Sequence, residues 1–366
     1  MRLRWPVLFL ILVVLVSSIH TQPVQAARGI PGSAEFGFGA RLNLYGSQFD
    51  QALQLAGTLR LDWLTIDLAW ASLMPDPTVA IDFTRLDQAM QTAAQNQTAV
   101  MLSITQPPAW ALTSQGPNPN LAAVFVQMLA ARYAGTLQAV EFFPSANTLT
   151  GWGAAPDPAA YWNAFSSVRS KLQESGISLE WIAGGLEITK NSSSGSMDEL
   201  DFLRGLYQAG AAGNLPVVSL RYSEITGQPS DPTQDSEKRL LRRYEAIRQV
   251  MTDNNQGNCL LWITHLSVPD GTINSGETST KDPNQQSNWL TQAATQLRAQ
   301  LYIGMVVFAD LNAVDSSQPT FKGANLSAGG HPFAKTLREI IQYNDPGDLG
   351  NPPGRAKNGA FTKPRS

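Results

Sequence analysis

Short apolar runs alternate with longer amphipathic segments along most of the 366-residue chain, and this alternation constrains its fold more than any other feature. Apolar runs of strand length occupy residues 36–44, 63–68, 99–105, 140–143, 179–183, 217–220, 259–264 and 303–308. The segments after them have helical character and occupy residues 48–56, 84–96, 121–133, 158–174, 197–210, 237–252, 285–300 and 333–343. In residues 121–133, for example, Val124, Phe125 and Met128 recur at helical spacing.

Eight strand–helix units in succession predict parallel strands, because each helix returns the chain to the start of the next strand. We therefore expect an α/β fold, a single (β/α)8 barrel over residues 35–343, with an open doubly wound sheet as the alternative. Long segments rich in Pro, Gly and Ser follow strands, at 106–120, 223–236, 265–284 and 309–332. In a barrel such loops form the face that carries the functional site.

The N-terminus has the layout of a secretory signal. Arg2 and Arg4 precede an apolar run at 7–16, and small residues precede a cleavage point after residue 26. The apolar run is shorter than the roughly 20 residues that a membrane-spanning helix needs. We expect a signal peptide at 1–26, a linker at 27–34 and a secreted or extracytoplasmic protein. An uncleaved N-terminal anchor is the alternative.

Composition excludes several classes of partner. Charged residues make up only 15% of the chain, the net charge is −3 and no run of Lys or Arg occurs, so we expect no nucleic-acid partner. The single cysteine, Cys259, excludes an internal disulfide, and three histidines leave little for a metal centre. We expect no cofactor and no metal, and the oligomeric state stays open. The tail at 344–366, rich in Pro, Gly and Lys, is expected to be disordered.

Several stretches together resemble the clan A glycoside hydrolases, in particular the family 39 and family 5 barrels. The stretches follow one another in the family's order at residues 36–46, 62–75, 102–111, 131–135, 157–161 and 261–264. The resemblance covers roughly residues 36–343 and implies a barrel built for sugars, with oligo- or polysaccharide as the partner. Retaining enzymes of this kind need two carboxylates about 5 Å apart, one as acid and one as nucleophile.

Both carboxylates of the family pattern are replaced in this sequence. The family's acid follows strand four in a Trp-Asn-Glu-Pro-Asn segment, which reads Phe-Pro-Ser-Ala-Asn at residues 143–147 and places Ser145 at the acid. The nucleophile follows strand seven, where His265 stands after Trp-Ile-Thr. The resemblance also aligns the family's strand-two Arg with Thr65, and its strand-six His with Arg221.

A serine has no proton to give near neutral pH, and an imidazole is a poor substitute for a carboxylate nucleophile. We therefore expect a barrel that is inactive as a retaining glycosidase and acts as a carbohydrate-binding pseudoenzyme. Aromatic rings and polar groups near strand ends are the expected sugar contacts: Trp70, Trp110, Asn147, Trp152, Arg221, Tyr222 and Trp262.

Three alternatives remain open. In the second interpretation, Ser145 and His265 face each other across the expected site. They would form the nucleophile–base pair of an esterase-like hydrolase. The third interpretation is an active glycosidase with displaced carboxylates, for which the candidates are Asp67, Glu187, Glu224 and Asp310. A rigid exported scaffold without a sugar ligand is the fourth. Glu141 shares a strand face with Ser145 and is expected to be a buried, paired structural acid.

Overall fold

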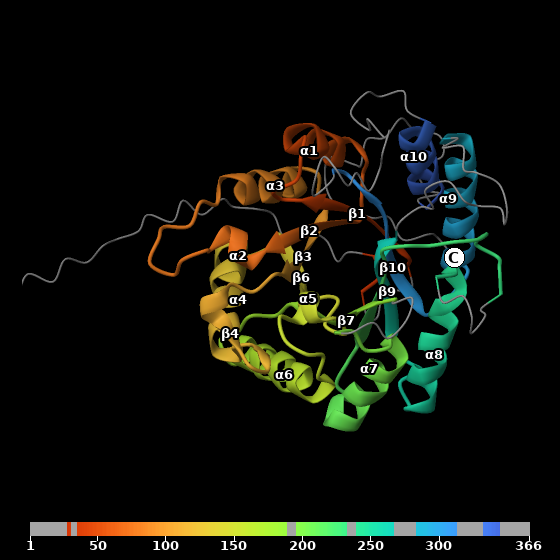
Figure 1. Cartoon of the computed structure of the whole chain (residues 1–366). Coiled ribbons are helices and arrows are strands. Elements are labelled where there is room, and N and C mark those ends of the chain that lie inside the picture. The colour runs from red at the N-terminus through yellow and green to blue at the C-terminus, as the bar shows by residue number, and fades with distance from the viewer. Residues whose placement is uncertain are drawn as a thin grey trace, which may run out of the picture.

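The chain folds into a closed barrel of eight parallel strands (Figure 1). The computed structural model describes residues 28–30, 35–188, 195–232, 239–266, 283–312 and 332–344. Around the barrel the strands follow the order β1-β10-β9-β8-β7-β6-β3-β2. Their bounds are β1 Gly37–Asn43, β2 Trp63–Ala69, β3 Ala99–Thr105, β6 Leu137–Phe142, β7 Glu180–Glu187, β8 Val217–Tyr222, β9 Leu260–Leu266 and β10 Ile303–Asp310. The predicted (β/α)8 barrel is confirmed, and each of its eight expected strands is present.

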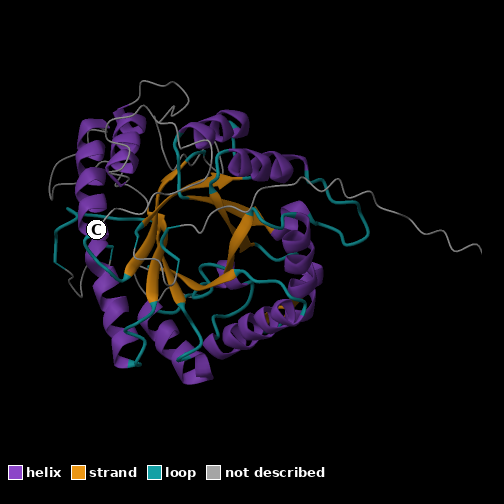
Figure 2. Ribbon diagram, turned by 180° about the vertical axis from the view of Figure 1, so that it is seen from behind, coloured by secondary structure: helices purple, strands orange, loops and turns teal. Residues whose placement is uncertain are grey.

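Helices surround the strands on the outside, as Figure 2 shows. The main ones are α1 Phe49–Thr58, α3 Thr84–Gln95, α4 Pro119–Arg132, α6 Pro158–Glu174, α7 Glu199–Leu206, α8 Tyr244–Asp253, α9 Pro283–Arg298 and α10 Pro332–Asn344. Two of these helices begin at residues that cap a helix well. The side chains of Asn118 and Asp157 accept hydrogen bonds from the first free backbone N–H groups of α4 and α6, and a proline follows each capping residue. Helix α8 begins later than the expected residue 237, after a single 3₁₀ turn.

Short elements follow the carboxyl ends of several strands. They are the helices α2 Trp70–Leu73 and α5 Leu149–Trp152, the 3₁₀ turn η1 Ala109–Ala111 and the hairpin of β4 Leu112–Thr113 with β5 Gly116–Pro117. A turn of π-helix, η2 Tyr207–Ala211, extends α7, and Gly210 near its end has a non-helical φ of 100°. Only glycine adopts such a conformation at little cost, which explains why the expected helix stops there.

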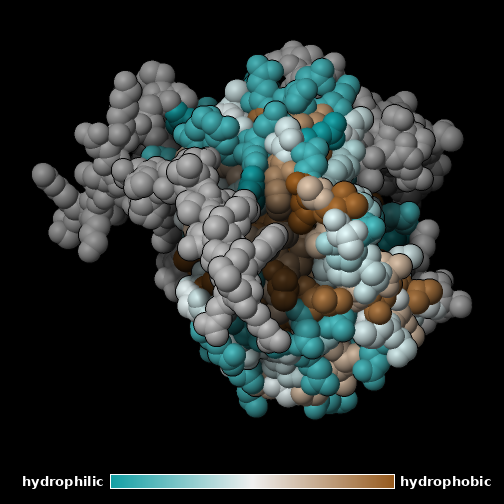
Figure 3. Space-filling model, turned by 90° about the vertical axis from the view of Figure 1, so that its left-hand side faces the viewer, coloured by the Kyte–Doolittle hydropathy of each residue, from teal (hydrophilic) through white to brown (hydrophobic). Residues whose placement is uncertain are grey.

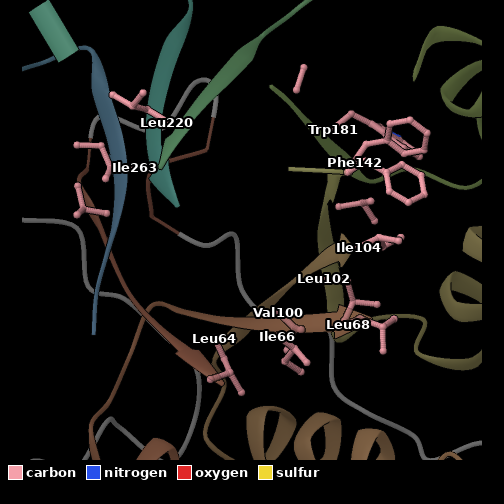
Figure 4. Packing of buried hydrophobic residues seen from close by; sticks show 14 of the residues in the cluster. Leu64, Ile66, Leu68, Val100, Leu102, Ile104, Phe142, Trp181, Leu220 and Ile263 are labelled. Carbon is pink, nitrogen blue, oxygen red and sulfur yellow. The ribbon is translucent and has the colours of Figure 1, made fainter. Parts of the chain in front are cut away.

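The two faces of each strand have different partners. Outward-facing side chains pack between the strands and the helices, and Figure 4 labels some of them, including Leu64, Ile66 and Leu68 of β2. Inward-facing side chains near the amino ends form a separate apolar layer inside the barrel: Trp63, Ala99, Met101, Ala139, Ile182, Val217, Trp262, Met305 and Val307. This layer fills the lower half of the barrel, so no channel passes through it.

Residues 28–30 close the amino end of the barrel. The indole of Trp63 donates a hydrogen bond to the carbonyl of Arg28 at 2.6 Å, and the indole of Trp262 donates to Gly29 at 2.9 Å. A Cβ on Gly29 would lie 2.1 Å from the carbonyl oxygen of Gly304, so the contact requires glycine. These residues belong to the stretch that the sequence assigns to a linker.

The expected signal peptide and tail lie outside the described residues. Within the described ranges, no helix is long and apolar enough to cross a membrane, and no group of His, Cys, Asp and Glu is arranged to hold a metal ion. The surface is a patchwork of hydrophilic and pale residues, with apolar side chains gathered around a hollow on the face seen in Figure 3.

Candidate functional site

The carboxyl end of the barrel carries a polar layer above the apolar one. We call it the mouth, and its inward-facing or strand-end residues are Arg41, Thr65, Asp67, Ser103, Glu141, Ser145, Glu187, Arg221, Thr264, His265 and Asp310. The position follows from strand alternation, because every second residue of a barrel strand points inward. Along β2, for example, Trp63 belongs to the apolar layer, and Thr65 and Asp67 follow it on the same face.

Arg41 of β1 is the first centre of the mouth. Its Nε and Nη2 donate to the two carboxylate oxygens of Asp310 at 2.7 and 3.0 Å, which is a bidentate pair. Its Nη1 lies 3.3 Å from Oδ2 of Asp67, and its Nη2 lies 3.1 Å from Nε2 of His265. Since a guanidinium group has only donors, Nε2 of His265 accepts. Arg41 therefore ties together four strands, β1, β2, β9 and β10.

Burial and charge act in opposite directions on these groups. Burial alone raises the pKa of Asp310, but the charge of Arg41, with a further contribution from His265, outweighs it and holds that pKa well below its usual range. Burial alone lowers the pKa of Arg41, and the charges of Asp310 and Asp67 reverse the effect and raise it. Burial and the charge of Arg41 lower the pKa of His265, so its imidazole is neutral at pH 7.

Glu141 of β6 is the second centre, and it is completely buried. Its carboxylate accepts from the hydroxyl of Ser103 and the hydroxyl of Thr264, both at 2.5 Å, and forms an ion pair of 3.3 Å with Nη1 of Arg221. The partners come from β3, β9 and β8. The contacts match the expected structural acid, since a buried carboxylate is tolerated only with such partners.

Ser145 lies on a strained turn between β6 and α5. Phe143 and Ser145 have φ of 43° and 60°, which non-glycine residues rarely adopt. The backbone N–H of Ser145 donates to the carbonyl of Gly185 at 2.7 Å. Gly185 itself has φ of 49°, and Pro144 leaves no room for a side chain there. The turn is therefore held against an irregular part of β7.

The hydroxyl of Ser145 donates to Oε2 of Glu187 at 3.1 Å. A serine has one hydrogen to donate, so this contact takes the proton that an esterase base would have to accept. His265 instead contacts Arg41 and lies 3.4 Å from Oδ2 of Asp310. The nucleophile–base pair expected from Ser145 and His265 has no counterpart in these contacts.

Four of the aromatic residues expected to bind sugar are packing residues, with at most 1% of their surface exposed: Trp70, Trp152, Tyr222 and Trp262. Trp70 stacks on Phe125 of α4, and the indole of Trp152 donates to the carbonyl of Gln115. Tyr222 faces outward, and its hydroxyl donates to the carbonyl of Leu241. Trp262 lies at the amino end of the barrel. A ring without exposed surface offers no face to a sugar, so these four are corrected to core positions.

The other expected contacts have mixed positions. Trp110 is half-buried on η1, with its indole donating to the carbonyl of Pro75 and its ring edge-on to Trp70. Arg221 lies in the mouth. Asn147 is completely buried and bonds the backbone of Glu187 on both sides, accepting from its N–H and donating to its carbonyl, so it positions β7. Glu224 is exposed and pairs with Arg239, away from the mouth network.

Sequence reasoning did not single out Arg41, Ser103 or Thr264 as site residues. The available signal was alternation, since Arg41 follows Gly37 and Gly39 on one face of a predicted strand. A charged residue at an inward position of a barrel strand requires partners, and searching for them would have found Asp67 and Asp310 at other strand ends.

No protein-family model and no curated protein matches the sequence, but solved structures match the fold. A family 39 glycoside hydrolase from Bacteroides cellulosilyticus WH2 superposes with a TM-score of 0.57 at 13% identity, over 84% of this chain and 63% of that one. A GH5_18 structure from Streptomyces cattleya, in complex with GlcNAc, gives 0.58 at 11%, over 90% and 82%. A xylanase mutant from Cellvibrio japonicus gives 0.52 at 16%, over 85% and 98%.

The fold is a (β/α)8 barrel similar in architecture to those of glycoside hydrolases. Glycoside hydrolases of families 30 and 113 superpose on it as well, at 12% and 9% identity. At such identities the likeness establishes the fold alone. The chain spans just under two thirds of the length of the family 39 structure, and the activity of that enzyme is not transferred to it.

Proposed function

We propose that this protein is an exported barrel that binds an oligo- or polysaccharide at its mouth without hydrolysing glycosides. The observation that carries the proposal is that Asp310 and Glu141 of the mouth are engaged by other groups. It is joined to the prediction from the sequence that Ser145 and His265 stand at the two carboxylate positions of the family. Export rests on the signal layout of residues 1–26 and is part of the proposal.

The acids of the mouth are poorly suited to glycosidase chemistry. A general acid needs a raised pKa, and that of Asp310 is lowered by Arg41, which also occupies both of its oxygens. Glu141 has no exposed surface and already accepts two hydroxyl hydrogens and an arginine. Neither carboxylate is free to protonate a leaving group or to attack an anomeric carbon.

Binding is supported by the polar character of the same layer. Sugars present hydroxyl groups that both donate and accept, and the partly exposed residues Asp67, Ser145 and Glu187 of the mouth offer hydroxyl and carboxylate oxygens to them. Trp110 supplies a partly exposed aromatic ring on the turn after β3. Aromatic surface of this kind packs well against apolar ring faces.

The test measures hydrolysis and binding on the same purified protein. We expect no product from a panel of aryl glycosides and polysaccharides under conditions in which a control glycosidase is active. On a glycan array we expect reproducible binding that Trp110→Ala weakens, while Leu301→Ala, at an exposed position before β10, leaves it unchanged. An array without any bound glycan would refute the proposal.

A second candidate is an active glycosidase whose carboxylates are displaced by one strand. Glu187 of β7 lies 3.1 Å from Ser145, and Asp310 of β10 lies 3.4 Å from His265, so a neighbouring strand places an acid beside each replaced position. Turnover of any glycoside that Glu187→Gln abolishes, with folding retained, would establish this candidate in place of the first.

A further inference from the structure

Acids outnumber cations in the mouth. Its described part carries four carboxylates and two guanidinium groups: Asp67, Glu141, Glu187, Asp310, Arg41 and Arg221. The imidazole of His265 is neutral because burial and Arg41 lower its pKa. The described part of the mouth therefore has an excess of two negative charges. Acidic side chains lined up in a site with low-dielectric walls attract a ligand of positive charge.

The pairing shows where the excess lies. Glu141 is matched by Arg221, and Asp310 takes the bidentate contact of Arg41. Asp67 shares the same guanidinium through one oxygen at 3.3 Å, and Glu187 receives a neutral hydroxyl from Ser145. Within the part of the mouth that the structure describes, Asp67 and Glu187 are therefore the two carboxylates without a cation of their own. They stand on β2 and β7, on different sides of the barrel.

Oδ1 of Asp67, Oγ1 of Thr65 and Nε of Arg221 belong to the same layer and are buried without a hydrogen-bond partner among the described residues. Thr65 is completely buried and Arg221 is 7% exposed. Thr65 lies two residues before Asp67 on the inward face of β2, and Arg221 stands in register with His265. Buried polar atoms are normally satisfied, and among the described residues a donor for Asp67 and an acceptor for Arg221 are missing.

From these contacts we infer that the ligand is a glycan with free amino groups, that is, a cationic amino sugar polymer or oligomer. The inference rests on the proposed function and names its ligand class. An ammonium group supplies charge and three donors to Asp67 or Glu187, and a sugar hydroxyl oxygen accepts from Nε of Arg221. An N-acetyl group removes the charge, and a uronic acid would add a third uncompensated negative charge.

The experiment compares two ligands that differ only in this group. Isothermal titration calorimetry is run with oligomers of β-1,4-linked glucosamine and with fully N-acetylated oligomers of the same length, at a mildly acidic pH that keeps the amine protonated. We expect the free-amine oligomer to bind at least about tenfold more tightly, as one charge-assisted contact provides, and added salt to reduce the difference.

Two variants assign the preference to the mouth. Asp67→Asn keeps the shape of the side chain and should remove most of the preference for the free amine, with thermal unfolding checked separately. The matched control is Asp87→Asn, which also loses an arginine-paired carboxylate, but on the surface of α3, and it should leave the preference unchanged.

The outcomes separate the two proposals. Equal or tighter binding of the acetylated oligomer, or binding of uronic acid polymers instead, would overturn the amino sugar inference and leave carbohydrate binding standing. A preference that persists in Asp67→Asn combined with Glu187→Gln would also overturn it. No binding of either oligomer or of any glycan on the array would overturn the proposed function together with the inference.

Discussion

Replacing Arg41 by methionine should destabilise the barrel. It should also reverse the way in which Asp310 makes the stability of the barrel depend on pH. Methionine keeps an unbranched side chain of similar length but removes the guanidinium group. The change leaves Asp310, 4% exposed, with both oxygens deprived of their donors, and it takes the cation from Asp67. Removing one partner of a buried ion pair typically costs about 3–5 kcal/mol, and we expect the loss at pH 7 to fall in that range.

The pH dependence follows from the pKa of Asp310. In the native protein this pKa lies below the unfolded value of about 3.9, so its stabilising contribution is present above that value and is lost as the pH falls toward the folded pKa. In Arg41→Met, burial without a cation raises the pKa of Asp310 above the unfolded value. The variant then loses stability as the pH rises, and its deficit relative to the native protein narrows toward pH 4.

A surface pair provides the matched control. Arg132 forms the same bidentate contact with Asp87, at 2.9 and 2.6 Å, but both side chains are more than 40% exposed. Arg132→Met should cost about 1 kcal/mol, including its contact with Phe83. Urea unfolding of both variants from pH 4 to pH 8 measures the difference. An Arg41→Met deficit no larger than that of Arg132→Met, or one that does not change with pH, would refute the reasoning.

Three further changes test other parts of the structure. Trp152→Ala should lower the free energy of unfolding in urea by about 3–5 kcal/mol, because the ring is 1% exposed. Trp110→Ala should lower this free energy far less, and it should instead weaken glycan binding measured by calorimetry. Gly116→Ala should also lower the thermal midpoint, since its Cβ would lie 2.3 Å from the Trp152 ring at a φ of 108°. Glu141→Ala should cost about 3–5 kcal/mol in urea, and adding Arg221→Met should recover part of that loss.

The strands were predictable because barrel strands are buried on both faces and therefore read as continuous apolar runs. The carboxyl ends of two strands were less predictable. Strand β9 runs to Leu266 and β10 to Asp310, beyond the apolar residues that marked them, and the mouth residues His265 and Asp310 lie on these extensions. The burial of Glu141 was foreseeable, because strand alternation places it inside the barrel below Ser145.

The site was only partly predictable, because its contacts join distant parts of the chain. Arg41 and Asp310 are 269 residues apart, and no local pattern pairs them. A tryptophan near a strand end has the same sequence signature whether it faces solvent or packs on a helix. Trp70 is buried because Phe125 of α4 stacks on it at a centroid distance of 4.6 Å, a contact that spacing along the chain does not reveal.

The central claim is that the mouth binds a glycan and releases it without hydrolysing it. In the most direct test, the protein is incubated with a glycan that it binds, and the molecular mass of the recovered glycan is then measured by mass spectrometry. The account predicts a saturable complex and a ligand of unchanged length and mass. Shortened chains with new reducing ends, absent when Glu187→Gln replaces the native protein, would contradict it.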